Sequence, residues 1–320
     1  MTKSSIKVVT KQKKVVESVK SPQRKVNGIL LLDKPKGDSS NHALQKIKRL
    51  FNAKKAGHTG TLDPLASGLL PVCFGEATKV AQYLLDSDKR YLSEFIFGSS
   101  TTTGDAEGEI SENKCWSSID EADVVRRMSD MTGELYQIPP MYSAIKSGGK
   151  RLYDLARKGL TIEREARKIN IRKFDLLSYQ APICSIDVTC SKGTYIRVLA
   201  EDLATALGTV GHVASLRRTQ SGAFHVKDAY TINALELLAE KNGVEFLDSV
   251  LLPLDHALTH LNKITLFPEI SRTFVNGLTL VAPSDFPEGE LLRVYSKSKF
   301  LGIGEVDENG RIVPKRGFNV

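Results

Sequence analysis

The sequence contains few cysteines, and none stands at a spacing that suggests a bound metal. The four of them, Cys73, Cys115, Cys184 and Cys190, form no CxxC pair, and no histidine follows them at zinc-finger spacing. Neither a structural zinc site nor a disulfide framework is indicated, as is usual for a protein of the reducing cytoplasm. The H-x-E and P-C-x-x-C zinc ligands of the nucleobase deaminases are also missing, which excludes that class of enzyme.

Long apolar runs are absent as well. No stretch approaches the roughly 18 apolar residues of a membrane span, and the N-terminus has no apolar segment of the secretory type. We find no glycine-rich loop between a strand and a helix that would bind a nucleotide cofactor, so a methyltransferase is not indicated. We therefore expect a cytoplasmic protein that has no membrane segment.

The net charge of the 320-residue chain is +8, and most of it lies at the N-terminus. Residues 1–25 contain eight Lys/Arg residues and one acid, Glu17, which leaves +7 in this segment. The rest of the chain is close to neutral, so the overall charge does not by itself show that the protein binds nucleic acid. We interpret residues 1–25 as a disordered basic arm.

Basic residues are also concentrated between Met141 and Arg197. This stretch contains twelve Lys/Arg residues and five acids. A local excess of this size suits a surface that contacts phosphates, although a solvated helix face would have the same charge. On the charge count alone, both interpretations stay open.

The first strongly apolar segment, Gly28–Pro35, predicts a buried strand, and a helix follows it. Ser39 supplies an N-cap for that helix, whose apolar residues Leu44 and Ile47 stand at helical spacing. The next segment, Gly57–Gly68, contains three glycines and a proline, so we expect a loop there.

Apolar periodicity and turn residues predict the elements that come after this loop. They are a strand at 69–75, a helix at 77–86, a strand at 91–98, a Gly- and Lys-rich insertion at about 139–169 with a short helix around 152–158, a strand at 183–191, a helix at 194–207 and a strand at 213–219. Beyond about residue 250 the sequence changes to short strand-like runs with frequent Pro and Gly, which predicts a small β domain.

Within the glycine-rich loop, Asp63 is the candidate for chemistry. An Asp before a Pro is usually a turn former, because its side chain accepts hydrogen bonds from nearby backbone N–H groups. Here His58 lies five residues away in the same loop, and basic residues lie on either side. The glycines of the loop, Gly57, Gly60 and Gly68, allow a ligand backbone to approach closely.

Across Gly57–Gly68 the sequence GHTGTLDPLASG closely resembles the GHTGxLDPxAxG motif of the TruB family of bacterial tRNA pseudouridine-55 synthases. Further blocks resemble the family in the same order between Gly28 and about Tyr230. They are GILLLDKPKGDSSN, the strand that begins KRY, QIPPMYSA, GTYIR and LRRT.

The resemblance implies roles for individual residues. It makes Asp63 the catalytic aspartate, Tyr91 the active-site tyrosine and Arg197 the arginine that pairs with the aspartate. His58 matches the histidine that occupies the space left by the extruded uridine, and the insertion resembles the family's RNA-clamping insertion. The other residues implied to contact or border the substrate are Lys34, Thr59, Gly60, Tyr195 and Leu216, together with Lys146, Lys150 and Arg151 of the insertion.

The implied reaction is the isomerisation of a uridine to pseudouridine at position 55 in the T-loop of tRNA. The N1–C1′ bond breaks, the uracil rotates, and C5 bonds to C1′, so nothing is added or lost and we expect neither a cofactor nor a metal. An ionised carboxylate can trap C1′, attack C6 of the ring or remove the 2′-hydrogen, and these three routes stay open. The target base must first be flipped out of the loop, at a cost of roughly a few kcal/mol.

Two other classes of function stay open on the residues alone. A tRNA-binding protein that remodels RNA without chemistry would need only the basic residues and the C-terminal domain, but Asp63 in its RNA groove would repel phosphate. A uracil-removing glycosylase would flip the base in the same way and would have to admit a hydrolytic water. The mass of the RNA separates the two reactions, because isomerisation leaves it unchanged.

The expected fold is α+β, with a mixed, largely antiparallel central sheet flanked by helices, and a doubly wound parallel sheet is the alternative. The expected organisation is an arm at residues 1–25, a catalytic domain at 26–250 and a C-terminal domain at 251–320. In the last of these, FLGIGEV followed by PKR resembles the small RNA-binding β-barrel called PUA that accompanies the family. We expect a monomer that binds the T-stem-loop of tRNA.

Overall fold

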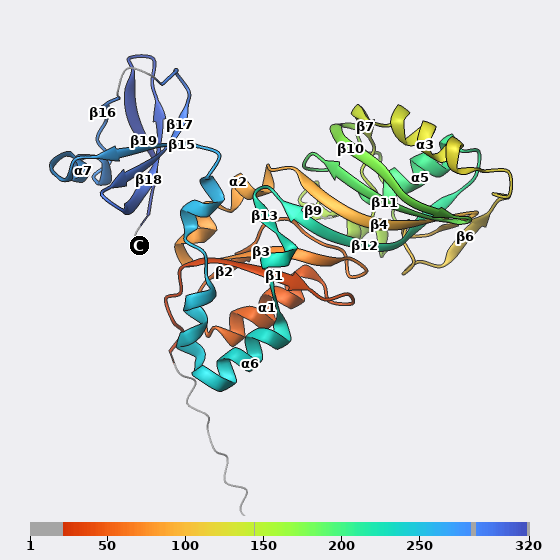
Figure 1. The fold of residues 1–320 in the computed structure, drawn as a ribbon, viewed down its shortest axis with the longest axis horizontal. Coiled ribbons are helices and arrows are strands. Elements are labelled where there is room, and N and C mark those ends of the chain that lie inside the picture. Colours follow the sequence, from red (N-terminus) through yellow and green to blue (C-terminus); the bar gives the residue numbers. More distant parts are fainter. Residues whose placement is uncertain (1–21, 144, 283–285, 319–320) are drawn as a thin grey trace, which may run out of the picture.

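The computed structural model describes residues 22–143, 145–282 and 286–318, and Figure 1 shows the arrangement of its elements. Residues 1–21, which make up most of the predicted basic arm, lie outside the described residues. Of the residues predicted to belong to the arm, Arg24 is bound to the body of the protein. Its backbone N–H donates to the carbonyl of Asn52 at 2.7 Å, and its guanidinium pairs with Asp248 at 2.5 Å.

The first half of the chain contains β1 (Gly28–Lys34), α1 (Ser40–Leu50), β2 (Ala56–His58), β3 (Ser67–Phe74), η1 (Gly75–Lys79), α2 (Ala81–Leu85), β4 (Lys89–Phe97), β5 (Ser99–Thr101), β6 (Ile110–Asn113), α3 (Glu121–Asp130), β7 (Gly133–Gln137), β8 (Lys146–Ser147), β9 (Lys150–Arg151) and α4 (Leu152–Ala156).

The second half contains β10 (Arg167–Gln180), β11 (Ile183–Cys190), α5 (Ile196–Ala206), β12 (Gly211–Ser221), β13 (Phe224–His225), η2 (Val226–Asp228), β14 (Tyr230–Thr231), α6 (Ile232–Asn242), η3 (Val244–Val250), η4 (Leu254–Leu258), β15 (Asn262–Leu266), α7 (Pro268–Val275), β16 (Leu280–Val281), β17 (Leu291–Ser296), β18 (Lys299–Val306) and β19 (Arg311–Gly317).

A ten-stranded sheet forms the centre of the molecule. Its order is β14-β1-β3-β12-β4-β11-β10-β7, with β2 paired to β3 and β13 paired to β12. The pairs β1–β14 and β3–β12 are parallel, and the other pairs in this sheet are antiparallel. The predicted mixed, largely antiparallel sheet flanked by helices is confirmed, and the doubly wound parallel alternative is wrong.

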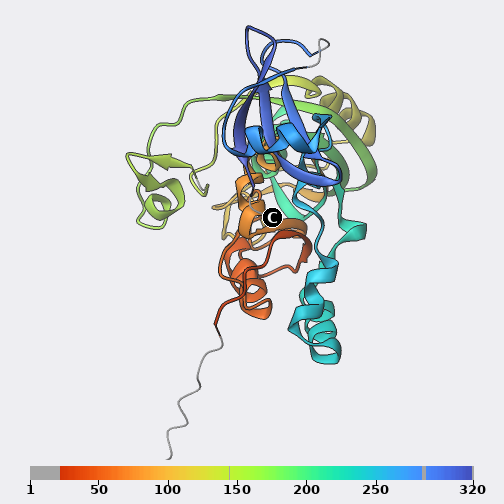
Figure 2. The same ribbon diagram turned by 90° about the vertical axis from the view of Figure 1, so that its left-hand side faces the viewer.

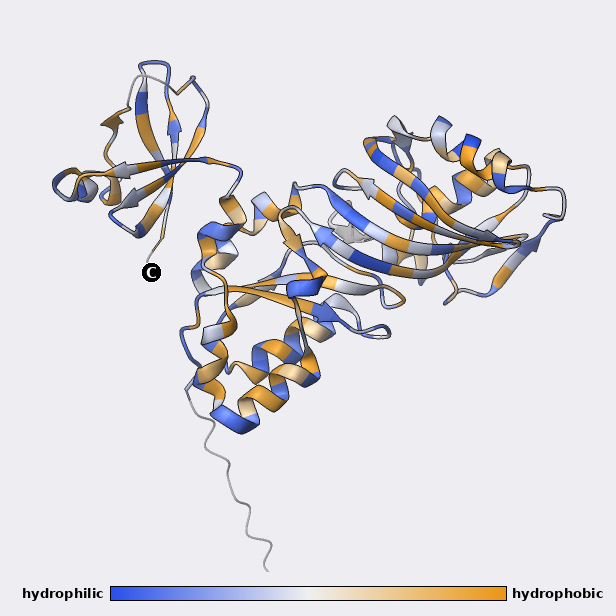
Figure 3. Cartoon of the chain, in the orientation of Figure 1, coloured by the Kyte–Doolittle hydropathy of each residue, from blue (hydrophilic) through white to orange (hydrophobic). Residues whose placement is uncertain are grey.

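Local sequence explains the elements that bear on the site. Ser39 caps α1 as predicted, because its side chain accepts a hydrogen bond from the backbone N–H of His42. Strand β4 alternates between buried and exposed residues, so that Lys89 and Tyr91 share its inner face. Figure 3 shows hydrophobic and hydrophilic colour on different sides of α6, as expected for a helix that packs on a sheet.

The main hydrophobic core lies between the central sheet and helices α1, α3, α5 and α6. Its fully buried members come from each of these helices and from the sheet, and include Ile47, Val124, Leu203, Leu235 and Phe95. This core supports both ends of the sheet on which the candidate site is built.

The C-terminal residues form a separate five-stranded curled sheet, in the order β15-β17-β18-β19-β16, seen at the upper left of Figure 1. A hydrophobic cluster joins it to the rest of the protein, because Tyr295 and Phe300 pack with Val80 and Leu84. The phenol of Tyr295 also donates a 2.5 Å hydrogen bond to the carboxylate of Asp255. The likeness of this sheet to the PUA barrel and the predicted domain limits stay predictions. Within the described residues, no helix is long and apolar enough to cross a membrane.

Candidate active site

The loop between β2 and β3 carries Asp63 and is fixed from below by α1. The hydroxyl of Ser40 accepts from the backbone N–H of Leu62 at 2.7 Å and donates to the carbonyl of the same residue at 2.9 Å. Leu62 and Leu65 on either side of Asp63 are buried. These neighbours anchor the loop in the core, and Asp63 between them is half-buried and lines a cavity.

Asp63 contacts Arg197, as the sequence led us to expect. One carboxylate oxygen of Asp63 lies 3.0 Å from Nε of Arg197, whose side chain is only 6% exposed against 38% for Asp63. The two terminal nitrogens of Arg197 donate to the backbone carbonyls of Thr103 and Tyr142, each at 2.7 Å. The guanidinium is therefore held in one orientation, with Nε turned toward the carboxylate.

A second carboxylate, which the sequence analysis missed, faces the same guanidinium. Asp105 is buried, and its oxygen lies 3.7 Å from Nε of Arg197. It accepts hydrogen bonds from the hydroxyl of Thr103 at 2.6 Å and from the backbone N–H of Glu107 at 3.1 Å. In the sequence, Asp105 stands in a polar run of Thr and Gly that is typical of a turn, so no local signal reveals its burial.

The surroundings of Asp63 raise its pKa above the usual range. Burial of the carboxyl group in its recess is the main cause, and Asp105 adds to it, while Arg197 and Lys34 act in the opposite direction. Lys34 is itself fully buried, and burial lowers its pKa to about 8. Its ammonium donates to the carbonyls of Pro35 at 2.9 Å and Asp38 at 2.6 Å, so it stands near the site as a fixed charge.

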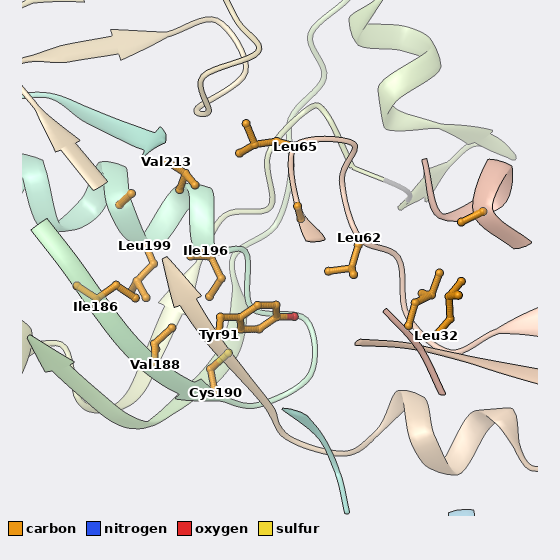
Figure 4. Packing of buried hydrophobic residues seen from close by; sticks show 14 of the residues in the cluster. Leu32, Leu62, Leu65, Tyr91, Ile186, Val188, Cys190, Ile196, Leu199 and Val213 are labelled. Atoms are coloured by element: carbon orange, nitrogen blue, oxygen red, sulfur yellow. The ribbon is translucent and has the colours of Figure 1, made fainter. Parts of the chain in front are cut away.

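Tyr91 lies on the inner face of β4 with 9% of its surface exposed. Figure 4 shows its ring beside Ile196 and Cys190, with the hydroxyl pointing toward Leu62. Burial raises the pKa of this phenol, and the nearby guanidinium of Arg218 opposes the rise. The hydroxyl therefore stays protonated at neutral pH and can donate a hydrogen bond into the site.

Arg218 was also missed as a site residue, although the LRRT block contains it. It is 1% exposed, and its guanidinium donates to the carbonyls of Leu69 at 2.7 Å and Gly60 at 3.2 Å. Its backbone passes so close to Gly68, where φ is +100°, that a β-carbon there would lie 2.3 Å from the Arg218 carbonyl oxygen. Glycine is thus required at position 68, and Arg218 holds the loop that carries Asp63 against β12.

These residues border a cavity of about 260 Å³. Six of the predicted site residues line it: Gly60, Asp63, Tyr91, Tyr195, Arg197 and Leu216. The residues that line it without having been predicted are Thr61, Leu62, Leu85, Lys89, Tyr142, Ser143, Ser191, Gly193, Thr194, Ile196 and Arg218. Gln137 fixes one wall, because its side-chain amide exchanges two hydrogen bonds with the backbone of Tyr195.

The remaining predicted site residues lie outside the lining of this cavity. His58 is on β2, where burial lowers its pKa and its Nδ1 has no hydrogen-bond partner among the described residues. Thr59 is fully buried, and its backbone N–H donates to the carbonyl of Pro71 at 3.0 Å. A contact of either residue with RNA stays a prediction.

The insertion stands out from one side of the body in Figure 2, in yellow-green. Lys146 is on β8, and Lys150 and Arg151 are on β9, which form a short antiparallel hairpin. Their side chains lie outside the described part of the structure, so their predicted contacts with RNA are not tested. Among the described residues, no group of three or more His, Cys, Asp or Glu side chains is placed to hold a metal ion.

Comparisons with family profiles match almost all of the described chain. Residues 48–196 match "TruB family pseudouridylate synthase (N terminal domain)", residues 197–259 match "tRNA pseudouridylate synthase B C-terminal domain", and residues 263–318 match "Pseudouridine synthase II TruB, C-terminal".

Individual curated proteins of the same family are similar to this chain over almost its whole length. The tRNA pseudouridine synthase B of Pseudomonas aeruginosa (strain UCBPP-PA14) is 48% identical over 299 residues, which cover 93% of this chain and 98% of that protein. The protein of the same name from Saccharophagus degradans (strain 2-40) is 45% identical over 304 residues, which cover 93% of this chain and 97% of that protein.

Solved structures share the fold. A chain of an H/ACA RNP bound to a substrate RNA containing 2′-deoxyuridine superposes with a TM-score of 0.71 at 23% identity, covering 92% of this chain and 85% of that chain. A chain of a Cbf5-Nop10-Gar1 complex gives a TM-score of 0.70 at 25% identity, covering 92% and 84%.

Proposed function

The chain belongs to the TruB family of pseudouridine synthases and is therefore an isomerase that forms pseudouridine in tRNA; from this premise we propose that its target is uridine 55 of the T-loop and that Asp63 is the catalytic carboxylate. One observation carries the proposal. Asp63 forms a 3.0 Å ion pair with Arg197 at the wall of a recess that also contains Tyr91.

The environment of Asp63 suits a carboxylate that acts on C1′, C6 or the 2′-hydrogen of a nucleoside. Its pKa is raised by burial, which makes it more basic and more nucleophilic than an exposed aspartate, while the positive charge of Arg197 opposes this rise and favours the ionised form. A carboxylate that is 38% exposed still has a free face for the substrate.

Tyr91 complements this carboxylate in the proposal. A flipped uracil that enters the recess meets the buried phenol ring, on which its flat face can stack. Because the pKa of the phenol is raised, the hydroxyl remains a donor and can bond a uracil oxygen while the base is detached from C1′. Such a bond would keep the base in the recess as it rotates from N1 to C5.

Binding of the T-stem-loop is assigned to surfaces outside the recess. The insertion would close over the stem through its basic residues, and His58 would fill the place of the extruded uridine, which offsets part of the cost of base flipping. The C-terminal sheet is proposed to bind RNA as a PUA-type domain, and the enzyme to act as a cytoplasmic monomer.

The arrangement favours this activity over RNA remodelling without chemistry, and the mass of the RNA separates it from a glycosylase. A protein that only remodels RNA would gain nothing from an ionised carboxylate in its groove, yet Asp63 is paired with a buried arginine. A glycosylase would release uracil and lower the mass of the RNA.

Incubation with an unmodified tRNA transcript tests the proposal. We expect carbodiimide mapping to detect pseudouridine at the T-loop uridine and mass spectrometry to find the RNA mass unchanged. Pseudouridine at another position would refute the assigned target, and loss of uracil would refute the reaction.

A further inference from the structure

Leu85 is an exposed leucine at the mouth of the active-site cavity. It is the last residue of α2, lines the cavity, and is 44% exposed. Leu62, in the loop that carries Asp63, also lines the cavity but is only 3% exposed. Single exposed leucines are common on protein surfaces, so the position of Leu85 needs a second observation before it acquires a meaning.

That observation is a buried lysine that fixes the end of α2. The ammonium of Lys89 donates to the carbonyls of Leu84 at 3.1 Å, Leu85 at 2.7 Å and Ser87 at 2.5 Å. Lys89 is 7% exposed, and burial lowers its pKa to about 8. A buried cation is costly, and this one satisfies the free carbonyls at the C-terminus of a five-residue helix. Leu85 is therefore held at the cavity mouth.

The catalytic loop leaves room beside Leu85. Gly60 faces it with φ at +86°, and a β-carbon built on Gly60 would lie 4.0 Å from Cδ2 of Leu85 and 3.5 Å from a guanidinium nitrogen of Arg218. A side chain at position 60 would fill the space between these two groups. With glycine there, the apolar side of Leu85 borders an open entrance.

The lining of the cavity matches a flat ring with apolar faces and polar edges. Leu62, Ile196 and Leu216 line it together with Tyr91, and charged residues, Asp63 and Arg197 among them, belong to the same lining. Its volume of about 260 Å³ lies just below the roughly 300–1,000 Å³ of pockets for drug-sized ligands, which suits a single nucleoside. Leu85 is the member of this apolar set with the largest exposed surface to lose when a base enters.

We infer that Leu85 contacts the flipped nucleobase of the RNA and that Lys89 is a positioning residue that holds Leu85 for this contact. The inference rests on the proposed function and extends it, because it assigns part of the binding energy of the flipped base to one exposed side chain. Burial of an apolar side chain is the physical source of that energy.

Steady-state kinetics of Leu85→Ala tests the contact. We expect Leu85 to contact the base equally in the enzyme–RNA complex and in the transition state, and loss of such a contact changes KM but not kcat. For Leu85→Ala, KM for tRNA should therefore rise about tenfold, while kcat should change less than about twofold. Leu85→Met keeps the apolar volume and should stay close to wild type. Leu237→Ala is the matched control, because Leu237 on α6 is 66% exposed and does not line the cavity. Equal KM values for Leu85→Ala and Leu237→Ala would overturn the inference.

A binding experiment identifies the group that Leu85 contacts. Hairpin RNA with uridine at the target position is compared with the same hairpin carrying an abasic site there. Leu85→Ala should lower the affinity for the uridine hairpin and leave the affinity for the abasic hairpin unchanged. Equal losses of affinity for both hairpins would mean that Leu85 contacts the RNA backbone, which would refute the inferred contact with the base. Wild-type enzyme that makes no pseudouridine would refute the proposed function instead, so the two failures are distinguishable.

A double-mutant cycle tests Lys89. If Lys89 acts through Leu85, Lys89→Gln should raise KM in the wild-type background and have little further effect in the Leu85→Ala background. Lys89→Arg, which retains the charge and the donors, should restore KM. Additive effects of Lys89→Gln and Leu85→Ala would show that Lys89 does not act through Leu85.

Discussion

Arg197 lies beside two carboxylates, those of Asp63 and Asp105, and the surroundings of the two differ. Asp105 is buried and already accepts two hydrogen bonds, so it is committed to its neighbours. Asp63 is the more exposed of the two and lines the cavity. Asp105 and two backbone carbonyls thus fix the guanidinium, and Asp63 is left with a face for the substrate.

The sequence predicted the pairing of Asp63 with Arg197 only through its resemblance to a family. No periodicity relates a loop residue to a distant helix, so pattern alone gives no contact between them. Asp105 and Arg218 were missed for the same reason. The burial of Asp105 depends on the backbone of its loop, where Ala106 donates to the carbonyl of Val213 on β12, and this packing has no local signature.

Asp63→Asn should abolish turnover while tRNA binding stays within about threefold of wild type. The amide keeps the shape of the side chain but lacks the charge that nucleophilic or base chemistry requires. Single-turnover pseudouridine assays and filter binding measure the two effects. Asp130→Asn, at an exposed position on α3, is the control and should behave as wild type. Turnover of Asp63→Asn within about tenfold of wild type would require another catalyst.

The activity should have an acid limb set by Asp63. The reaction needs the ionised form, and burial raises the pKa of this group, so kcat should fall as the pH drops through that raised pKa.

Arg197→Lys should be severely impaired, because an ammonium does not reproduce the oriented guanidinium. Its residual activity should show the acid limb at higher pH, because lysine lacks the Nε donor that stands 3.0 Å from the carboxylate and helps to lower its pKa. A pH profile from acid to neutral measures both, and an unmoved limb would contradict the assignment.

At the scale of elements, the sequence was most reliable where one side of an element is buried. Strand β4 and helices α1 and α5 lie close to their predicted limits, because alternation, an N-cap and a terminal glycine act locally. The predicted helix at 77–86 is instead a 3-10 turn, η1, followed by the short α2. The predicted loop at Gly57–Gly68 begins as a strand, because the residues of β2 pair with the edge of β3, a contact that depends on tertiary packing.

The insertion is the element for which charge should matter most. Neutralising Lys146, Lys150, Arg151 and Arg157 together should raise KM for tRNA at least about tenfold with little change in kcat, because phosphate contacts position the RNA without taking part in chemistry. Arg157 is exposed and directly follows the last residue of α4, where its loss does not disturb the core. Steady-state kinetics at physiological salt measures the effect.

A control of equal charge separates position from net charge. Neutralising Lys114, Arg126, Arg127 and Lys241, which lie outside the insertion and are exposed or half-buried, removes the same four charges. This variant should bind tRNA almost as wild type does. Similar losses in both quadruple variants would mean that the insertion has no special part in binding.

At the scale of the whole molecule, a hydrophobic cluster connects the C-terminal sheet to α2, whose last residue borders the candidate active site. Leu84 belongs to the cluster that joins this sheet to the body, and the next residue, Leu85, lines the cavity that contains Asp63. Lys79 donates to the carbonyl of Gly317 at 3.2 Å and so adds a polar link. The sequence predicted a small β domain here, but the docking surface combines apolar residues of segments 29–84 and 224–318, which are far apart in the sequence, so it could not be predicted locally.

The N-terminal arm should add affinity without choosing the target. The structure suggests where to cut, because Arg24 is bound to Asn52 and Asp248, so removal of residues 1–21 leaves the anchored part intact. This deletion removes six lysines and one acid, Glu17. Lysines that contact phosphates release counterions, each contributing about 0.7–0.9 to the slope of log K against log salt. The truncated enzyme should therefore bind tRNA modestly more weakly and with a shallower salt dependence, while modifying the same uridine, since site choice depends on the recess around Asp63.

Binding titrations from low to physiological salt measure the affinity and its salt dependence, and carbodiimide mapping of the product identifies the modified uridine. A full-length variant with the six lysines changed to Gln should match the truncation, because the loss is one of charge. A truncation that moved the modified position, or that kept the wild-type salt slope, would contradict this division between arm and active site.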